Sequence, residues 1–394
     1  MNILGFEIPE NYSQYLEYLP VFGLSVLISL ILTPIAGYIA RRSKIIAYPP
    51  SMRDGTKLSD FRHLEKQPTP LLGGLAVIIP LILLTISHTY PTPQITSLLL
   101  ATTALVVLGT IDDIYELPGT IQMFLQILIV AFICISPINV TFINNPVGGI
   151  INLDYASLVG TIWNFPLEFI FPGDIILGLW ILVCINAVKW VSGTDGLLEG
   201  NAFVCCITLF LLSVRIHANT PAVISIIFAG LILGFLFFNF YPAKIRSGSS
   251  GKSTYGFILA VLSVLSGTKF ATAIIILMLP LIDFFWVIIT RIIKNRPKNI
   301  ISLFMISDQN HLHHKLLGLG LSEQQIAFTE YLATAVFGTI ALAFTGAMKA
   351  VFLLVTMIVV AMLIGYITFK IQHRQLTKTT KSEPKDTPEK RYTY

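Results

Sequence analysis

Eleven long apolar stretches constrain the fold of this 394-residue chain more than any other feature. A helix needs about 17 to 25 mostly apolar residues to cross the hydrocarbon core of a membrane. Hydrophobic residues make up 54% of the sequence and charged residues only 12%, which is typical of a chain that folds within lipid. The sequence therefore predicts an all-α polytopic membrane protein with about eleven transmembrane helices. The stretches lie at about 16–40, 71–87, 95–111, 121–143, 173–191, 198–214, 221–240, 254–268, 270–290, 326–346 and 349–369.

Positive charges are distributed unevenly between the two sides of these stretches. With the N-terminus outside, 23 of the 26 Lys and Arg residues fall in cytoplasmic segments, and only Arg215, Lys269 and Lys349 do not. Cytoplasmic loops accumulate Lys and Arg, so we expect this orientation. The net charge of +5 then reflects topology and attraction to anionic lipid headgroups, and it does not indicate a nucleic-acid partner.

This orientation predicts three parts of a multi-pass protein of the cell membrane. We expect an external N-terminal segment 1–15, a single multi-span membrane domain 16–369 and a disordered cytoplasmic tail 370–394. Residues 1–15 lack a basic region and an early apolar stretch, so no cleaved signal peptide is expected. The external insertion 144–172 contains Asn, Pro and Gly turn signals and predicts a short hairpin. The four cysteines lie in or beside apolar stretches without metal-ligand spacing, which predicts buried thiols at Cys134, Cys184, Cys205 and Cys206.

Two polar groups at cytoplasmic ends of the stretches have the residue types of a catalytic site. His311, His313 and His314 are three of the seven histidines. A solvated loop is the simpler interpretation, but imidazoles this concentrated are typical of sites that bind phosphate, ligate metals or transfer protons. Asp112 and Asp113 close another stretch. Adjacent carboxylates repel each other, so they need a cation, a proton or a catalytic role.

Further polar residues lie at the same side. Asn186 and Lys189 are about one helical turn apart and can face one interior surface, where polar groups are functional candidates. The Gly, Ser and Lys residues of 247–253 could cradle phosphate oxygens with backbone amides, but their spacing is not that of a Walker A loop. Residues 67–74 are equally well explained as a structural turn. We expect these groups to converge on one site at the cytoplasmic face.

The order of these groups resembles a known family, the polyprenyl-phosphate N-acetylhexosamine-1-phosphate transferases. These membrane enzymes are related to the phospho-N-acetylmuramoyl-pentapeptide transferase of peptidoglycan synthesis. The likeness covers about residues 20 to 365, and it is the ordered set, rather than any single piece, that is specific. The matching pieces are Pro68-Thr69-Pro70 with Gly73-Gly74, Asp112-Asp113, Asn186 with Asp195-Gly196-Leu197, Asn239 with Pro242-Ala243-Lys244, Asp283, and His311-Leu312-His313-His314.

The resemblance implies transfer of N-acetylhexosamine 1-phosphate from a UDP-sugar to a polyprenyl phosphate, with release of UMP, for cell-envelope glycan synthesis. It implies catalytic roles for Asp112, Asp113 and Asp195, with Mg²⁺ held by Asp112 and Asp113. The implied partners are the lipid phosphate and the nucleotide-sugar, and the sequence is compatible with a homodimer. The substrate-binding residues that it implies are Asn186, Lys189, Lys244, Lys252, His311, His313 and His314.

Four positions depart from the family's pattern. Lys189 and Ser249 stand where the family carries an Asn and a metal-binding Asp. A hydroxyl substitutes poorly for a carboxylate on a hard cation, and this weakens the expectation of Mg²⁺. Gln122 replaces a Lys, and Ser192 replaces the first acid of a pair whose second acid is Asp195.

Three hypotheses follow from these matches and departures. In the first, the chain is an active transferase in which Lys189, with Lys252 or Arg246, supplies charge normally given by the metal. In the second, it is a catalytically silent relative that binds polyprenyl phosphate or nucleotide-sugar as a regulator or assembly partner. A transporter or channel would also explain polar residues within spans. It would not explain why they gather at one face, with no polar track across the membrane.

Overall fold

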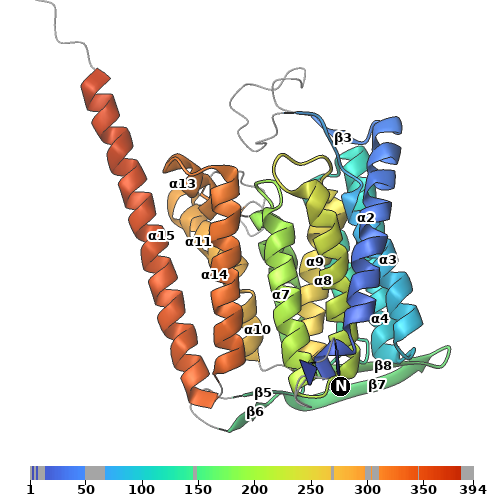
Figure 1. The fold of residues 1–394 in the computed structure, drawn as a ribbon. Helices are drawn as coiled ribbons and strands as arrows, with labels where there is room; N and C mark the ends of the chain where they lie inside the picture. Colours follow the sequence, from blue (N-terminus) through green and yellow to red (C-terminus); the bar gives the residue numbers. More distant parts are fainter. Residues whose placement is uncertain are drawn as a thin grey trace, which may run out of the picture.

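Long helices that run roughly along one direction form most of the structure, a computed structural model (Figure 1). It describes residues 2–3, 6–7, 14–48, 67–144, 149–267, 270–297, 303, 310–344 and 346–382. Helix α2 (Leu19–Arg42) ends, and helix α9 (Gly248–Leu265) begins, at the upper end of the bundle in Figure 1. We call this the polar end. The opposite end carries two pairs of antiparallel strands, and we call it the hairpin end.

Every predicted apolar stretch overlaps a helix. Within the described ranges, seven helices are long and apolar enough to cross a membrane, and α3 and α5 are apolar but shorter. The predicted class, an all-α polytopic membrane protein, is therefore confirmed. Besides α2 and α9, the helices are α3 (Gly73–His88), α4 (Pro93–Tyr115), α5 (Gly119–Cys134), α6 (Gly173–Val191), α7 (Leu197–Arg215), α8 (Asn219–Asn239), α10 (Phe270–Ile276), α11 (Met278–Asn295), α13 (Leu312–Gly318), α14 (Glu323–Ala343) and α15 (Gly346–Ser382).

Three predicted boundaries differ from the structure. The stretch 121–143 is wrong at its C-terminal end, because α5 stops at Cys134 and Pro137 follows, which cannot continue a helix. The stretch 270–290 is two helices, α10 and α11, separated at Leu277. Helix α15 continues to Ser382, so residues 370–382 are helical where a disordered tail was expected, while 383–394 lie outside the described residues.

Short antiparallel strands cap the hairpin end. Most of the predicted hairpin segment 144–172 forms β6 (Ile150–Asn152), β7 (Asp154–Ile162) and β8 (Phe165–Pro172), and β6 pairs with β5 (Phe142–Asn144). Asp174, buried at the start of α6, accepts hydrogen bonds from the backbone N–H of Ile170 and Val140 at 2.6 and 3.4 Å. These bonds join the hairpins to the helices. The other strands are β1 (Asn2–Ile3), β2 (Phe6–Glu7), β3 (Ile46–Ala47) and β4 (Thr69–Pro70).

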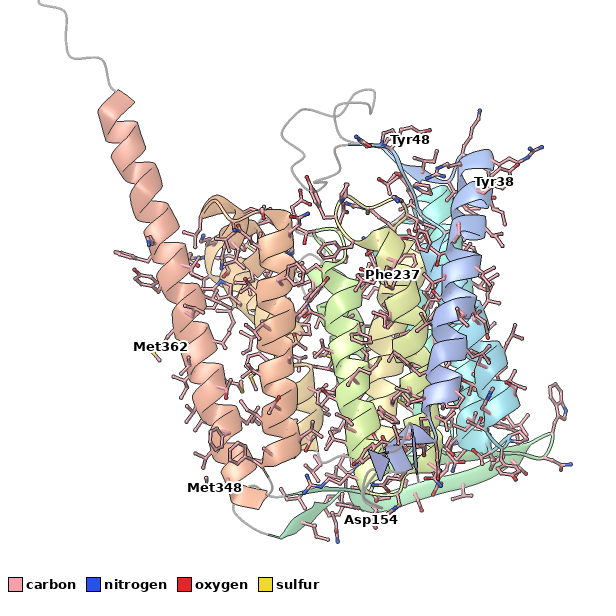
Figure 2. All side chains as sticks on the ribbon, in the orientation of Figure 1. Tyr38, Tyr48, Asp154, Phe237, Met348 and Met362 are labelled. Atoms are coloured by element: carbon pink, nitrogen blue, oxygen red, sulfur yellow. The ribbon has the colours of Figure 1, made fainter. Side chains whose placement is uncertain are left out.

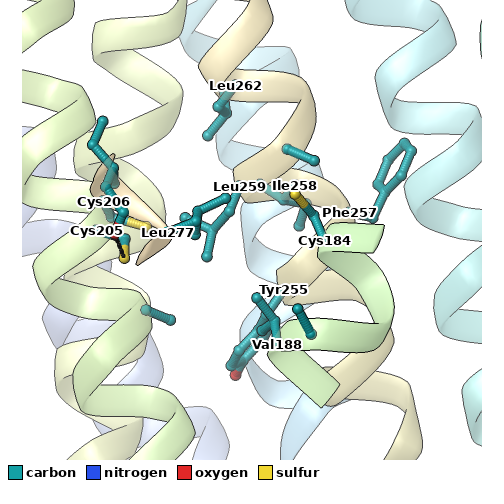
Figure 3. Packing of buried hydrophobic residues seen from close by; sticks show 14 of the residues in the cluster. Cys184, Val188, Cys205, Cys206, Tyr255, Phe257, Ile258, Leu259, Leu262 and Leu277 are labelled. Carbon is teal, nitrogen blue, oxygen red and sulfur yellow. Dashed lines mark hydrogen bonds between the residues drawn. The ribbon is translucent and has the colours of Figure 1, made fainter. Parts of the chain in front are cut away.

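The core lies where α6, α7, α8 and α9 meet. Phe228, Phe235, Tyr255 and Phe257 are among its largest fully buried side chains. Figure 3 shows part of this packing, with thiols from α6 and α7 among apolar side chains of α9. The predicted thiols are confirmed as free, and three of them are fully buried: Cys184, Cys205 and Cys206, with Cys134 half-buried.

Apolar side chains also cover the outside of the bundle. Tyr38 of α2 and Met362 of α15 are each 61% exposed and point away from the other helices (Figure 2). An apolar outer surface of this kind is stable only against lipid, since contiguous apolar patches are small on soluble monomers. The outer surface therefore supports the membrane assignment independently of helix length.

Small residues let two of the helices approach closely. Gly230 and Gly234 of α8 lie four residues apart, and a Cβ on either would come too close to Ser25 or Ser29 of α2. Small residues at this spacing are a common basis of helix packing in membranes, where the hydrophobic effect does not drive helices together. Helix α2 is thus attached to α8 mainly by close backbone approach.

Candidate active site

Asp112 lies near the C-terminal end of α4, and a relay of hydrogen bonds connects it to α6. Its Oδ1 accepts from the Leu117 N–H at 2.9 Å and from Gln122 Nε2 at 2.7 Å. Gln122 Oε1 in turn accepts from Lys189 Nζ at 2.7 Å. One amide therefore bridges a carboxylate and an ammonium group. Gln122, which departs from the family's Lys, is the residue that makes this bridge possible.

Asp113 uses both of its oxygens to bind the start of α9. Oδ1 accepts from the Ser249 N–H at 2.6 Å, and Oδ2 accepts from the Ser250 N–H at 3.2 Å and from Ser250 Oγ at 3.0 Å. First-turn N–H groups have no partner within their own helix, so Asp113 caps α9 from another helix. Gly248 has φ +66° and a Cβ there would overlap Asp113, so only glycine fits. The positive charge of Lys252, one turn into α9, also acts on Asp113.

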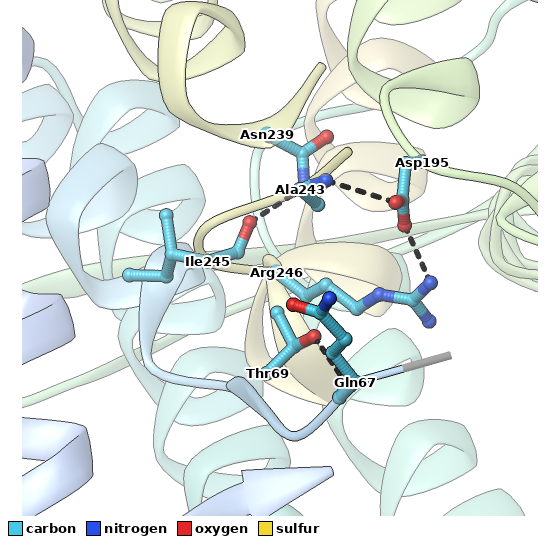
Figure 4. A network of polar contacts seen from close by, with 7 residues as sticks. All are labelled: Gln67, Thr69, Asp195, Asn239, Ala243, Ile245 and Arg246. Atoms are coloured by element: carbon cyan, nitrogen blue, oxygen red, sulfur yellow. Dashed lines mark hydrogen bonds and ion pairs between the residues drawn. The ribbon is translucent and has the colours of Figure 1, made fainter. Parts of the chain in front are cut away.

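Asp195 is the third carboxylate at the polar end, just before α7. Its Oδ1 accepts from Arg246 at 2.5 Å and its Oδ2 accepts from the Ala243 N–H at 2.9 Å (Figure 4). Asn239 Nδ2 donates to Ile245 O at 2.9 Å in the same loop. The Asp195 carboxylate therefore holds the segment between α8 and α9 in place, and Arg246 is its fixed counter-ion.

The histidine segment begins α13 and is anchored to α11. His311 Nδ1 lies 2.8 Å from Asp283 Oδ2, and Asp283 Oδ1 accepts from the Leu312 N–H at 2.7 Å. The imidazole rings of His311 and His313 stack with centroids 5.6 Å apart, and those of His313 and His314 are 4.4 Å apart. Burial, with a smaller contribution from the charge of His314, lowers the pKa of His313 to about 3. His313 is therefore a neutral imidazole near pH 7.

This segment packs against the turn between α6 and α7, which also carries Asp195. A Cβ on Gly193 would overlap the ring of His313, so the backbone of this turn lies directly against the imidazole. The Trp190 ring meets that of His311 edge-on at 5.6 Å, and the guanidinium of Arg291 lies 4.5 Å from the Trp190 ring centroid. The histidines and the acidic residues thus belong to one region of the polar end.

The structure brings some of the predicted site residues together and leaves others apart. Asp112, Asp113, Lys189 and Lys252 form one electrostatic group, since the charges of the other three all act on Lys189. Lys244 is exposed, and its backbone oxygen accepts from Arg41. The predicted residue Asn186 also binds elsewhere than the carboxylates, since its Nδ2 donates to Leu182 O within α6. Ser192, one of the departures from the family's pattern, donates its Oγ hydrogen to Lys189 O.

One residue of this region was not predicted from the sequence. Glu199, in the first turn of α7, is 2% exposed and lines a cavity of about 20 Å³ with Asp195, Arg246 and Lys252. Buried polar atoms on this cavity have no hydrogen-bond partner among the described residues: Thr194 Oγ1, Glu199 Oε1 and Asn239 Oδ1. A cavity of this size holds one water molecule, which could bind two of these atoms. An acid at the start of an apolar stretch was the available signal.

A second cavity lies within the apolar part of the bundle, beside the break between α10 and α11. Its volume is about 370 Å³ and its exposed lining is almost entirely apolar. It is large enough for a section of a hydrocarbon chain, and it offers such a chain no polar partner. The lining residues are Ile176, Leu179, Trp180, Val183, Ile274, Met278, Leu281, Ile282, Phe285, Leu353 and Met357.

The carboxylates do not form a divalent-cation site. No group of three His, Cys, Asp or Glu residues suited to a metal occurs within the described ranges. Both oxygens of Asp113 and of Asp195 already accept hydrogen bonds, and Lys189, Lys252 and Arg246 lie among the carboxylates. A hard cation such as Mg²⁺ requires several oxygen ligands without a competing positive charge. The residues present therefore do not fit the Mg²⁺ that the resemblance implies.

Comparison with known proteins shows which family the chain is similar to. The family model for glycosyl transferase family 4 matches residues 95–267, which include Asp112, Asp113 and Asp195. A Bacillus subtilis (strain 168) protein named "Probable undecaprenyl-phosphate N-acetylglucosaminyl 1-phosphate transferase" is 27% identical over 357 residues, which cover 88% of this chain and 91% of that protein.

Two further relatives show the breadth of the likeness. A Mycobacterium leprae (strain TN) decaprenyl-phosphate N-acetylglucosaminephosphotransferase is 28% identical and covers 80% of this chain and 81% of its own length. A Bacillus subtilis phospho-N-acetylmuramoyl-pentapeptide-transferase is 27% identical and covers 64% and 76%. The ordered motifs of the sequence and these relatives agree. The chain is therefore similar to proteins of glycosyl transferase family 4 over its central part and to named transferases over most of its length.

Proposed function

We propose that this protein transfers N-acetylhexosamine 1-phosphate from a UDP-sugar to a polyprenyl phosphate and releases UMP. The observation that carries the proposal is the convergence of carboxylates, cations and histidines at one end of a membrane bundle. The named activities of the relatives supply the reaction class. On the charge bias of the loops, this end faces the cytoplasm of a cell-membrane protein, where the nucleotide-sugar is available.

The acceptor is a lipid, and the bundle offers it two environments. Its apolar tail would lie in the cavity of about 370 Å³ beside α6, α10, α11 and α15. Its phosphate would reach the polar end, because α6 carries both cavity-lining residues and Lys189. A phosphate monoester carries about 1.5 to 2 negative charges at pH 7, so it is a nucleophile without a strong base.

The transfer step joins the two phosphates. An oxygen of the lipid phosphate attacks the β-phosphorus of the UDP-sugar. The bond between that phosphorus and the bridging oxygen breaks, and its electron pair leaves with UMP. Phosphoryl transfer depends mainly on positioning and on stabilising charge on the phosphoryl oxygens. Lys189, Lys252 and Arg246 would supply that charge, and neutral His313 can donate one hydrogen bond to a phosphate oxygen.

The direct test is release of UMP from radiolabelled UDP-N-acetylglucosamine by purified protein with undecaprenyl phosphate. We expect UMP and a lipid-linked product in equal amounts. His313→Ala and Asp195→Asn should each reduce turnover by about 100-fold, the usual loss for a positioned polar group. Thr161→Ala, at the exposed hairpin end, is the control. UMP release that is equal in all three variants would contradict the site. Absence of turnover with labelled nucleotide still retained would indicate a silent binding protein.

A further inference from the structure

Three carboxylates at the polar end, those of Asp112, Asp113 and Asp195, each lie near a side-chain cation. Asp195 pairs directly with Arg246 at 2.5 Å. Asp112 is joined to Lys189 through Gln122, with both hydrogen bonds at 2.7 Å. The positive charge of Lys252 acts on Asp113, which also accepts hydrogen bonds from the N–H groups at the start of α9. The cations come from α6, α9 and the loop before α9, so the pairing arises from the tertiary structure and not from neighbouring residues.

The pairing makes the region's charge comparable to that of a metal site. The negative charges of Asp112, Asp113 and Asp195 are equal in number to the positive charges of Lys189, Lys252 and Arg246, with Glu199 outside this set. Three carboxylates with one divalent cation would leave a net negative charge. The paired arrangement therefore repels an incoming diphosphate no more than a metal-loaded acidic site would. The aligned peptide groups at the start of α9 add a partial positive charge.

The same arrangement disfavours a divalent cation. Mg²⁺ at Asp113 would have to replace three hydrogen bonds that hold α9, and it would be close to Lys252. Mg²⁺ at Asp112 would be within the electrostatic range of Lys189. Positive charges close together in a partly buried site repel more strongly than they do in water. Donor occupation and charge repulsion therefore act in the same direction.

We propose that Lys189, Lys252 and Arg246 hold the diphosphate of the nucleotide-sugar directly, and that this protein binds it without a divalent cation. The proposal rests on the function proposed above for the substrate class. Lys189 and Lys252 are half-buried at the polar end, where their ammonium groups can donate to phosphate oxygens while Gln122 and the α9 backbone keep the carboxylates engaged. The Asp195–Arg246 pair fixes the loop in which Arg246 lines a cavity together with Lys252.

The primary measurement is binding of UDP to the purified full-length protein by calorimetry, first in EDTA and then with Mg²⁺. We expect dissociation constants that agree within about threefold, a difference of less than 1 kcal/mol. UDP binding that is at least tenfold tighter with Mg²⁺ than in EDTA would overturn the proposal. Absence of UDP binding in EDTA would also overturn it.

Charge-removing variants test two of the three cations, Lys189 and Lys252. In EDTA, Lys189→Gln and Lys252→Gln should each weaken UDP binding by about tenfold or more, the usual effect of losing a hydrogen bond to a charged group. Arg42→Gln is the matched control, because it removes one exposed positive charge from the same end of the bundle. Equal weakening of UDP binding in all three variants would indicate a long-range effect of charge. It would contradict direct contact of Lys189 and Lys252 with the diphosphate. Thermal unfolding of each variant identifies any loss of folding.

Turnover separates this proposal from the proposed function. UMP release that persists in EDTA supports both. UMP release that appears only with Mg²⁺ overturns the fixed-cation proposal and leaves the function intact. UDP binding in EDTA that is lost in Lys189→Gln, with no UMP release under either condition, supports the fixed cations and contradicts the transferase activity.

Discussion

At the scale of single residues, buried polar groups at the polar end are held by specific partners. Asp283 of α11 is 3% exposed and uses its two oxygens for His311 and for the Leu312 N–H. Burial of a carboxylate is costly unless it is paired and hydrogen-bonded, and here both conditions are met. The position of the histidine segment therefore depends on one side chain that lies 28 residues earlier in the sequence.

The contact between Gly193 and His313 makes a sharp prediction. Gly193→Ala should displace the His313 ring and lower UMP release by about tenfold or more, because small misplacements of a positioned group are costly. Gly119→Ala is the control, since nothing lies within 4 Å of a Cβ there. Turnover assays on both variants check this. Equal activity of Gly193→Ala and the wild type would show that His313 need not occupy its observed position.

The depressed pKa of His313 predicts how stability depends on pH. Unfolded His313 gains a proton below its ordinary pKa of 6.5, whereas folded His313 gains one only near pH 3. The unfolded state binds more protons between these values, so acidification should lower stability by about 1.4 kcal/mol per pH unit from this residue. Above pH 6.5 its contribution is constant. The residues that act on His313, namely Asp283, His311 and His314, are unchanged in a variant that replaces His313 alone. Comparison of that variant with the wild type therefore isolates the contribution of His313.

Thermal unfolding of the wild type and of His313→Gln, measured from pH 7.5 down to pH 4, tests this slope. The melting temperature of the wild type should fall more steeply below pH 6.5 than that of the variant. Parallel curves would show that His313 is accessible to protons in the folded protein.

At the scale of elements, the start of α9 is the critical point. Its own N-cap residue, Ser247, makes no side-chain capping bond, and Asp113 of α4 supplies the cap instead. Close approach of the helices makes this possible, because a Cβ on Gly109 would overlap the backbone of Ser250. The acid pair Asp112-Asp113 is thus divided: one member joins α4 to α5 and α6, and the other joins α4 to α9.

Removal of this cap should destabilise the protein. Asp113→Ala should lower the free energy of unfolding by about 1 to 2 kcal/mol, the range for loss of a helix cap. Asp113→Asn keeps one acceptor oxygen and should cost less. Thr92→Ala removes the single capping bond of α4, at 3.4 Å, and should cost less than Asp113→Ala. Denaturation in detergent micelles gives the comparison, and an unchanged midpoint for Asp113→Ala would contradict the capping role.

At the scale of the whole molecule, the two ends of the bundle have opposite characters. The carboxylates, cations and histidines gather at the polar end, and the exposed strand β7 lies at the hairpin end (Figure 1). An enzyme that brings a membrane lipid and a nucleotide-sugar together needs this asymmetry, since the two substrates arrive from different phases. The charge bias predicts that the hairpin end is external.

Cysteine labelling can test this orientation. In a variant without the four native cysteines, Thr161→Cys at the hairpin end should react with a membrane-impermeant maleimide on intact cells. Thr120→Cys, exposed at the polar end, should react only after the membrane is permeabilised. Both patterns reversed would mean that the chain has the opposite orientation and that the active site faces outward.

The sequence by itself determined the class of fold, the approximate helix positions and the residues that meet at one end. Apolar length and charge bias are local properties, and lipid imposes them on any spanning helix. The order of Asp112-Asp113, Asp195 and the histidines was sufficient to indicate the family. It did not indicate what each carboxylate binds.

Only the tertiary structure decided those partners. Asp113 binds residues 136 and 137 positions away, and Lys189 reaches Gln122 across 67 positions. Such contacts depend on how closely helices pack, which is set by glycines such as Gly109 and Gly248 rather than by the acids themselves. A buried charge must find a partner wherever the packing places one. Which partner each of these carboxylates binds is therefore a property of the fold.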